Sequence, residues 1–148
     1  MDEILISKVE LLNEIKDIIF EFDRTFTPSL KSRVLNLNKY SEKLYNNAIT
    51  LKAIYNGDIV GFASFYCNDR INFISYLTQI SVKDTARNKG IGQLLLKKVI
   101  EFCHDNNMKF LRLEVYNENI PAIKLYEKNE FYKIGNATND SCYMERKL

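Results

Sequence analysis

The sequence is poor in the residues that bind metals and form disulfides. Its 148 residues contain one histidine, His104, and three scattered cysteines, Cys67, Cys103 and Cys142, with no Cys-x-x-Cys pair. A tetrahedral zinc site draws on several Cys and His side chains, so we expect no metal in this protein. An odd number of scattered cysteines is also typical of reduced thiols rather than of a disulfide framework.

Long apolar runs, repeats and strong net charge are lacking as well. No stretch approaches the ~20 apolar residues that a membrane span needs. The acidic start, Met1-Asp2-Glu3, lacks the basic-then-apolar pattern of a signal peptide, so we expect a cytoplasmic protein without a membrane partner. A net charge of +2 does not indicate nucleic acid as a partner. The length and the absence of a linker predict a single domain over residues 1–148.

Hydrophobic periodicity and turn signals divide the chain into alternating elements. Ser7 and Glu10 have the spacing of a capping box before the first helix, Asn56-Gly57 is a hairpin turn, and Asn119 with Pro121 begins the last helix. We predict strands at 4–6, 49–55, 59–67, 72–82, 110–115, 131–134 and 141–145, and helices at 8–25, 39–46, 90–105 and 119–129.

This order of elements predicts an α/β (α+β) fold. The three strands between residues 49 and 82 follow one another closely and form an antiparallel meander. The strand–helix–strand unit from 72 to 115 is expected to be a right-handed crossover with parallel strands. The result is a mixed, mostly antiparallel central sheet of about seven strands with helices on both faces.

The segment Arg87-Asn88-Lys89-Gly90-Ile91-Gly92 stands where a strand leads into a helix. Glycines allow a ligand close to the backbone, and a helix N-terminus favours a phosphate. Arg87 and Lys89 add positive charge beside it. The same residues are also compatible with a helix start that is flexible because of its glycines and that carries two solvent-exposed basic side chains. A generic nucleotide-binding module is a further alternative.

Two commoner phosphate motifs do not fit this segment. A Walker loop needs Gly-Lys-Ser/Thr, whereas Gly90 is followed by Ile91 and Gly92. A dinucleotide fingerprint needs a third glycine at the position of Leu95, and it follows the first strand of its fold rather than the fourth. The pattern that remains is Arg-x-x-Gly-x-Gly.

That pattern, in this order of elements, resembles motif A of the GNAT superfamily of N-acetyltransferases. A second segment, residues 119–131, resembles the family's motif B, with Asn119 followed by Ala122 and Tyr126 at the family spacing. The helix closes with Glu130-Phe131 where the family has Gly-Phe. The resemblance covers the chain from about Ile49 to its end, and it implies the acyl-CoA N-acyltransferase fold of that superfamily.

The resemblance implies a transferase that moves the acetyl group of acetyl-CoA to a primary amine by direct attack in a ternary complex, without a metal. The backbone of Ile80, Ser81 and Val82 would pair with the pantetheine arm beside a splayed strand. Backbone N–H groups of the loop residues Arg87, Asn88, Lys89, Gly90, Ile91 and Gly92 would hold the pyrophosphate. Asn119 would contact the coenzyme beyond it.

Tyr126 matches the family's thiol-protonating tyrosine, and its phenol is protonated at neutral pH. The alternative is an ordinary aromatic residue packed in the core. Glu114 is the candidate base, five residues before Asn119, as in the ribosomal-protein N-terminal acetyltransferases. Alternation places Arg112, Glu114 and Tyr116 on one face of their strand. In the alternative, Glu114 has a structural role and pairs with Arg112 or a lysine.

The amine acceptor is not identified by the sequence. The family resemblance places acceptor recognition in residues 25–40 and 135–142, with Phe26, Arg33, Tyr40, Tyr76 and Tyr143 as candidates. These loops contain no acidic cluster, which favours a small molecule such as an amino sugar or an amino acid derivative over a polyamine. A protein N-terminus and a non-catalytic acetyl-CoA sensor are the alternatives. Dimers are common in the family, so a homodimer is one option.

Overall fold

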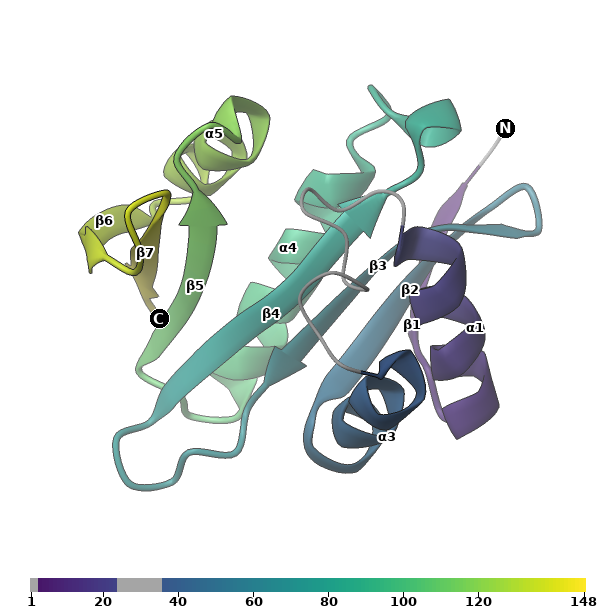
Figure 1. The fold of residues 1–148 in the computed structure, drawn as a ribbon, viewed down its shortest axis with the longest axis horizontal. Coiled ribbons are helices and arrows are strands. Elements are labelled where there is room, and N and C mark those ends of the chain that lie inside the picture. Colours follow the sequence, from purple (N-terminus) through teal and green to yellow (C-terminus); the bar gives the residue numbers. More distant parts are fainter. Residues whose placement is uncertain (1–2, 24–35) are drawn as a thin grey trace. The chain divides into compact units, whose positions relative to one another are not determined.

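The computed structural model describes residues 3–23 and 36–148, and in these it has four helices and seven strands (Figure 1). The strands are β1 (Ile4–Lys8), β2 (Ile49–Tyr55), β3 (Asp58–Tyr66), β4 (Ile74–Val82), β5 (Phe110–Tyr116), β6 (Tyr132–Asn136) and β7 (Ser141–Lys147). The helices are α1 (Leu12–Phe22), α3 (Leu37–Asn47), α4 (Ile91–Asp105) and α5 (Ile120–Lys128).

The strands form one seven-stranded sheet in the order β1-β2-β3-β4-β5-β7-β6. β4 and β5 are parallel, whereas β1–β2, β5–β7 and β6–β7 are antiparallel pairs. The predicted mixed, mostly antiparallel sheet is confirmed, and so is the parallel pairing across α4. The described residues form two compact units. The first unit comprises those up to residue 64 together with 79–96, and the second unit comprises 65–78 together with 97–148.

In the first unit, helices pack on both faces of the sheet, as predicted, and two neighbouring residues of β3 show how. Successive side chains of a strand point to opposite faces. The ring of Phe62 meets that of Phe22 from α1 edge-on, with 5.2 Å between centroids. A Cβ on Gly61 would instead lie 3.2 Å from Ile91 and 3.3 Å from Leu95, both from the first turns of α4. Figure 1 accordingly shows α1 and α3 on one side of β2 and β3 and the start of α4 on the other.

The start of α1 differs from the prediction. Ser7 does not cap a helix: it pairs with Lys52 as part of β1, and the strand continues to Lys8. Val9 N–H then donates to Thr50 O at 2.8 Å, which prolongs the association with β2. The helix begins at Leu12 without a side-chain cap. Sheet pairing of β1 therefore outweighs the local capping signal. The predicted end of this helix near Thr25 lies outside the described residues.

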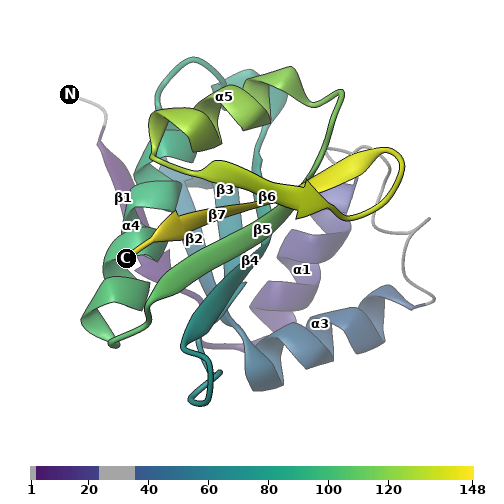
Figure 2. The ribbon, with the colours of Figure 1, turned by 90° about the vertical axis from the view of Figure 1, so that its left-hand side faces the viewer.

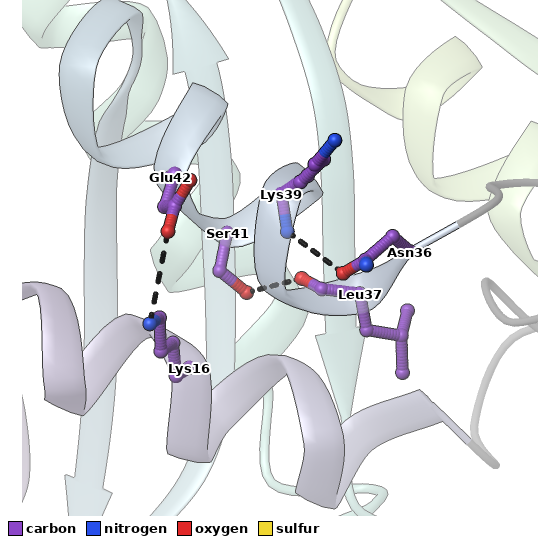
Figure 3. Close-up of polar contacts among 6 residues, drawn as sticks. All are labelled: Lys16, Asn36, Leu37, Lys39, Ser41 and Glu42. Atoms are coloured by element: carbon purple, nitrogen blue, oxygen red, sulfur yellow. Dashed lines mark hydrogen bonds and ion pairs between the residues drawn. The ribbon is translucent and has the colours of Figure 1, made fainter.

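The short α3 begins two residues earlier than predicted because Asn36 caps it. Asn36 Oδ1 accepts a hydrogen bond from Lys39 N–H at 3.1 Å (Figure 3). One turn on, the buried Ser41 hydroxyl donates to Leu37 O at 2.8 Å within the same helix. Lys16 of α1 faces Glu42 of α3 at 3.9 Å. Both partners of this ion pair are partly exposed, so the contact contributes little to stability.

The second unit is organised around β5, which lies between β4 and β7. Leu111, Leu113 and Val115 are buried, whereas Glu114 between them is exposed, so the predicted alternation is confirmed. β7 runs antiparallel to β5 along its whole length, and β6 forms the outer edge beside β7 (Figure 2).

Turns and helix ends fall where residues can adopt a positive φ. Asn56 and Gly57 have φ of 51° and 82°, which confirms the predicted hairpin. α4 ends at Asp105, and Asn107, two residues beyond it, has φ of 63°. α5 ends in the same way at Glu130, φ 69°, with Phe131 N–H bonded to Tyr126 O at 3.0 Å. This is the Schellman pattern, in which the left-handed position is usually glycine.

Candidate functional site

The coenzyme-strand residues predicted from the sequence lie at the end of β4, in the first unit. Ile80, Ser81 and Val82 are half-buried. Among the described residues, the register of β4 with β5 runs from Ile74–Phe110 to Leu77–Leu113, although β4 continues to Val82. The last residues of β4 therefore extend past the end of that ladder.

The predicted phosphate loop follows immediately. Residues Asp84–Ala86 form one 3-10 turn, and Asn88 and Gly90 then have φ of 66° and 74°. The first helical hydrogen bond of α4 runs from Leu94 N–H to Gly90 O at 3.0 Å, so the N–H groups before it have no acceptor within the helix. Space around Gly90 is open, since a Cβ added there would have no atom within 4 Å. The loop thus presents backbone donors at a helix N-terminus, which favours an anion.

The two basic residues of this loop have partners within the first unit. The exposed Arg87 guanidinium lies 3.0 Å from Asp84 Oδ1. Lys89 Nζ lies 5.0 Å from the centre of the Tyr55 ring, as a cation–π pair. Both contacts are solvent-accessible and weak. An anion of two or more charges competes well against them.

Asn119 is the N-cap of α5 and Tyr126 lies within that helix, in the second unit. Asn119 Oδ1 accepts from Ala122 N–H at 3.3 Å, so the side chain predicted to meet the coenzyme also caps this helix, as the sequence indicated. Tyr126 is 6% exposed, and its ring packs on Phe131 with 5.6 Å between centroids. Burial raises the pKa of the Tyr126 phenol well above its ordinary value. The side chain therefore holds its proton throughout the neutral range.

Glu114 is held by a hydroxyl group rather than by a cation. Ser141 Oγ donates to Glu114 Oε2 at 2.6 Å. Arg112, the partner considered from the sequence, instead binds Glu145 with two hydrogen bonds of 3.1 and 2.8 Å. The alternative in which Glu114 pairs with Arg112 is thus not observed, because Glu145 stands directly opposite Arg112 in the antiparallel register. Glu114 keeps an exposed carboxylate on the polar face of β5.

The candidate acceptor residues are only partly described. Phe26 and Arg33 lie outside the described residues. Tyr40 of α3 accepts a hydrogen bond from Gln79 Nε2 at 2.7 Å, within the first unit. Tyr143 stands opposite Glu114 in the β5–β7 register, so both side chains lie on one face.

Two residues that matter to this geometry were missed in the sequence. Gly61 allows α4 to approach β3, and a glycine inside a strand does indicate such an approach. Ser141 fixes the Glu114 carboxylate, and no sequence pattern pointed to it because its partner is 27 positions away. In residues 3–23 and 36–148, no group of three His, Cys, Asp or Glu side chains is placed to hold a metal ion. None of the helices in these residues is long and apolar enough to cross a membrane.

Comparison with known proteins gives a consistent result. The sequence model described as the acetyltransferase (GNAT) family matches residues 12–131. An L-amino acid N-acetyltransferase of Escherichia coli is 34% identical over 85 residues, covering 55% of this chain and 51% of that protein. The chain spans about half or less of the length of the curated relatives it matches.

Solved structures share the fold over nearly the whole chain. An N-acetyltransferase from Thermoplasma acidophilum, solved in complex with coenzyme A, matches with a TM-score of 0.78, 20% identity and 99% coverage of both chains. A ribosomal-protein-alanine N-acetyltransferase from Brucella melitensis matches with a TM-score of 0.79 and 21% identity, over 97% of this chain and 99% of the other.

Proposed function

We propose, from the premise that this chain belongs to the acetyltransferase (GNAT) family, that it acetylates a primary amine by direct attack within a ternary complex. The family match supports an acetyltransferase that uses acetyl-CoA. The activity of the whole protein, the order of its steps, the residues that perform them and the acceptor are proposed.

The chain's own residues fit a coenzyme with a pyrophosphate. The donors at the start of α4, the open space at Gly90 and the positive φ of Asn88 and Gly90 suit a doubly charged anion near the backbone. Ile80, Ser81 and Val82 would offer the backbone of β4 to the pantetheine arm. Asn119 would contact the coenzyme beyond the loop. When bound, acetyl-CoA supplies an acetyl group activated as a thioester.

Two side chains would handle protons. The exposed carboxylate of Glu114 would take a proton from the amine nitrogen, directly or through water. The phenol oxygen of Tyr126 would hold a proton for the departing sulfur. Its raised pKa supports a protonated phenol at neutral pH, and a backbone N–H near Val82 would stabilise the oxyanion.

For the acceptor we propose a small molecule, an amino acid derivative or an amino sugar. The described part of the late hairpin, residues 135–142, contains one acidic residue, Asp140, so it lacks the acidic cluster that a polycation would favour. The L-amino acid N-acetyltransferase named above supports the amino acid class. The alternative acceptor is a protein N-terminus, which the position of Glu114 favours.

The observation that carries the proposed mechanism is the exposed Glu114 carboxylate, whose only hydrogen bond among the described residues is the one from Ser141. The acceptor is tested by measuring coenzyme A release from acetyl-CoA with a panel of free amino acids, amino sugars and N-terminal peptides. Turnover with one of the small amines supports the proposal. Turnover with peptides alone would establish the alternative, and tight acetyl-CoA binding without any turnover above hydrolysis would indicate a sensor.

The base is tested by Glu114→Gln. This variant keeps the shape of the side chain and its contact with Ser141 but cannot accept a proton. We expect turnover to fall most at low pH, where the amine most needs deprotonation. A pH–rate profile identical to that of the wild type would show that Glu114 is not the base and has a structural role.

A further inference from the structure

We propose that Ser141 and Thr138 are positioning residues for Glu114: their two hydroxyl groups, hydrogen-bonded in series, hold the carboxylate in one orientation and leave one of its oxygens for the amine. The inference rests on the proposed role of Glu114 as base. All the residues involved belong to the second unit.

The direction of each hydrogen bond follows from counting protons. Ser141 has one hydroxyl proton, and a carboxylate can only accept, so Ser141 Oγ donates to Glu114 Oε2 across 2.6 Å. Ser141 Oγ also lies 2.7 Å from Thr138 Oγ1, and it must therefore accept the Thr138 proton. Thr138 Oγ1 in turn accepts from Asp140 N–H at 3.1 Å. The three bonds form one directed chain that ends on the carboxylate.

Burial restricts the conformation of Ser141, the middle residue of this series of hydrogen bonds. Ser141 is 0% exposed, whereas Thr138 and Glu114 are exposed. The carbonyl of Ser141 also accepts from Ala137 N–H at 2.9 Å and from Thr138 N–H at 3.2 Å, which closes the turn and fixes the hydroxyl of Thr138 beside it. Ser141 thus has a fixed backbone, a buried side chain and a single available orientation of its proton.

The charged and titratable groups around Glu114 leave its carboxylate without a counter-ion among the described residues. On β5, Arg112 is bound to Glu145 of β7, and Tyr116 lies on the other side of Glu114. From β7, Tyr143 stands directly across, and Asp140 lies in the turn before it. On β4, Tyr76 pairs with Arg112. Among the described residues, hydroxyl donation from Ser141 is therefore the polar contact that fixes the Glu114 carboxylate.

The consequence for the proposed reaction is geometric. Oε2 is occupied by Ser141, so the second oxygen, which accepts no hydrogen bond from the described residues, is the one that faces the incoming amine or its water. Without the Ser141 donor, no hydrogen bond from the described residues fixes either carboxylate oxygen.

The test is the split between kcat and KM in Ser141→Ala. A hydrogen bond to a charged group is strong enough to change a rate by roughly tenfold. We expect kcat to fall by about that factor, with KM for acetyl-CoA unchanged, and Ser141→Thr, which keeps the hydroxyl group, to restore most of kcat. Thr138→Val, an exposed and nearly isosteric change that leaves Ser141 in place, should lower kcat by less.

Ser41→Ala is the matched control, because Ser41 is also buried and also donates a hydrogen bond, but to its own helix. It should lower the melting temperature without changing kcat. An unchanged kcat in both Ser141→Ala and Thr138→Val, or a loss that Ser141→Thr does not restore, would overturn the positioning role. If Glu114→Gln lowers kcat while Ser141→Ala and Thr138→Val leave it unchanged, this inference alone fails. If Glu114→Gln also leaves kcat unchanged, the proposed base fails with it.

Discussion

Gly61 of β3 offers the sharpest test of how the phosphate loop is held. An alanine Cβ at this position would lie 3.0 Å from Ser81 O, 3.2 Å from Ile91 Cγ2 and 3.3 Å from Leu95 Cδ1. The isoleucine and leucine side chains can adjust, but Ser81 O is a backbone atom of β4. Relief therefore requires movement of β4 or of the first turns of α4.

The expected cost of Gly61→Ala follows from this crowding. Overpacking a well-packed interior by a methyl group costs about 1–3 kcal/mol. For a chain of this size, that lowers the melting temperature by roughly 2–12 °C. Because Ser81 belongs to the proposed pantetheine strand and Ile91 to the phosphate loop, KM for acetyl-CoA should rise several-fold, whereas KM for the amine changes little.

The assay combines thermal unfolding with steady-state kinetics in both substrates. Gly135→Ala is the matched control, because no atom lies within 4 Å of its added Cβ and its φ is not positive. Its stability should stay within about 0.5 kcal/mol of the wild type. A Gly61→Ala protein with unchanged melting temperature and unchanged KM for acetyl-CoA would refute the reasoning.

Three further outcomes are expected. Tyr126→Phe should lower kcat while acetyl-CoA affinity stays nearly intact; unchanged turnover would remove Tyr126 as the acid. Burial raises the pKa of the Cys103 thiol to about 12, so a maleimide at pH 7.5 should label the half-buried Cys67 first and reach Cys103 only after unfolding, as mass spectrometry can show. Backbone N–H groups of Asn72 and then Ile71 lower the pKa of the Asp69 carboxyl. A group whose pKa is lower in the folded than in the unfolded protein stabilises the fold above its unfolded-state pKa of ~3.9. That stabilisation is lost as the pH falls through the folded-state pKa. Urea midpoints of Asp69→Ala should therefore lie below the wild type at pH 7 and approach it toward pH 3; a constant gap would contradict this.

Most helices and strands can be predicted from the sequence because the hydrophobic periodicity of each segment agrees with the turn and capping residues at its ends. The hairpin at Asn56-Gly57 and the capped start of α5 at Asn119 depend only on neighbouring residues, and both are confirmed. Ser7 shows the limit: its capping spacing is genuine, but pairing with β2 places it in a strand. A cross-strand partner lies outside any local window.

The same limit applies to the candidate site. The phosphate loop is predictable because its residues are consecutive. The partner of Glu114 is not, because the choice between Arg112 and Ser141 depends on the β5–β7 register, which sets Glu145 against Arg112. Whether Tyr126 acts as an acid or only packs against Phe131 stays a prediction, since burial is compatible with both.

Glu130 joins a backbone effect and a charge effect in one residue. It has a left-handed backbone at φ 69°, and its carboxylate lies 3.0 Å from Arg146, which also donates to Asn129 O at 2.8 Å. A glycine at position 130 would relieve the backbone strain and would remove the exposed ion pair at the same time. The hydrogen bond from Arg146 to Asn129 O would remain, so Arg146 would still join β7 to the end of α5.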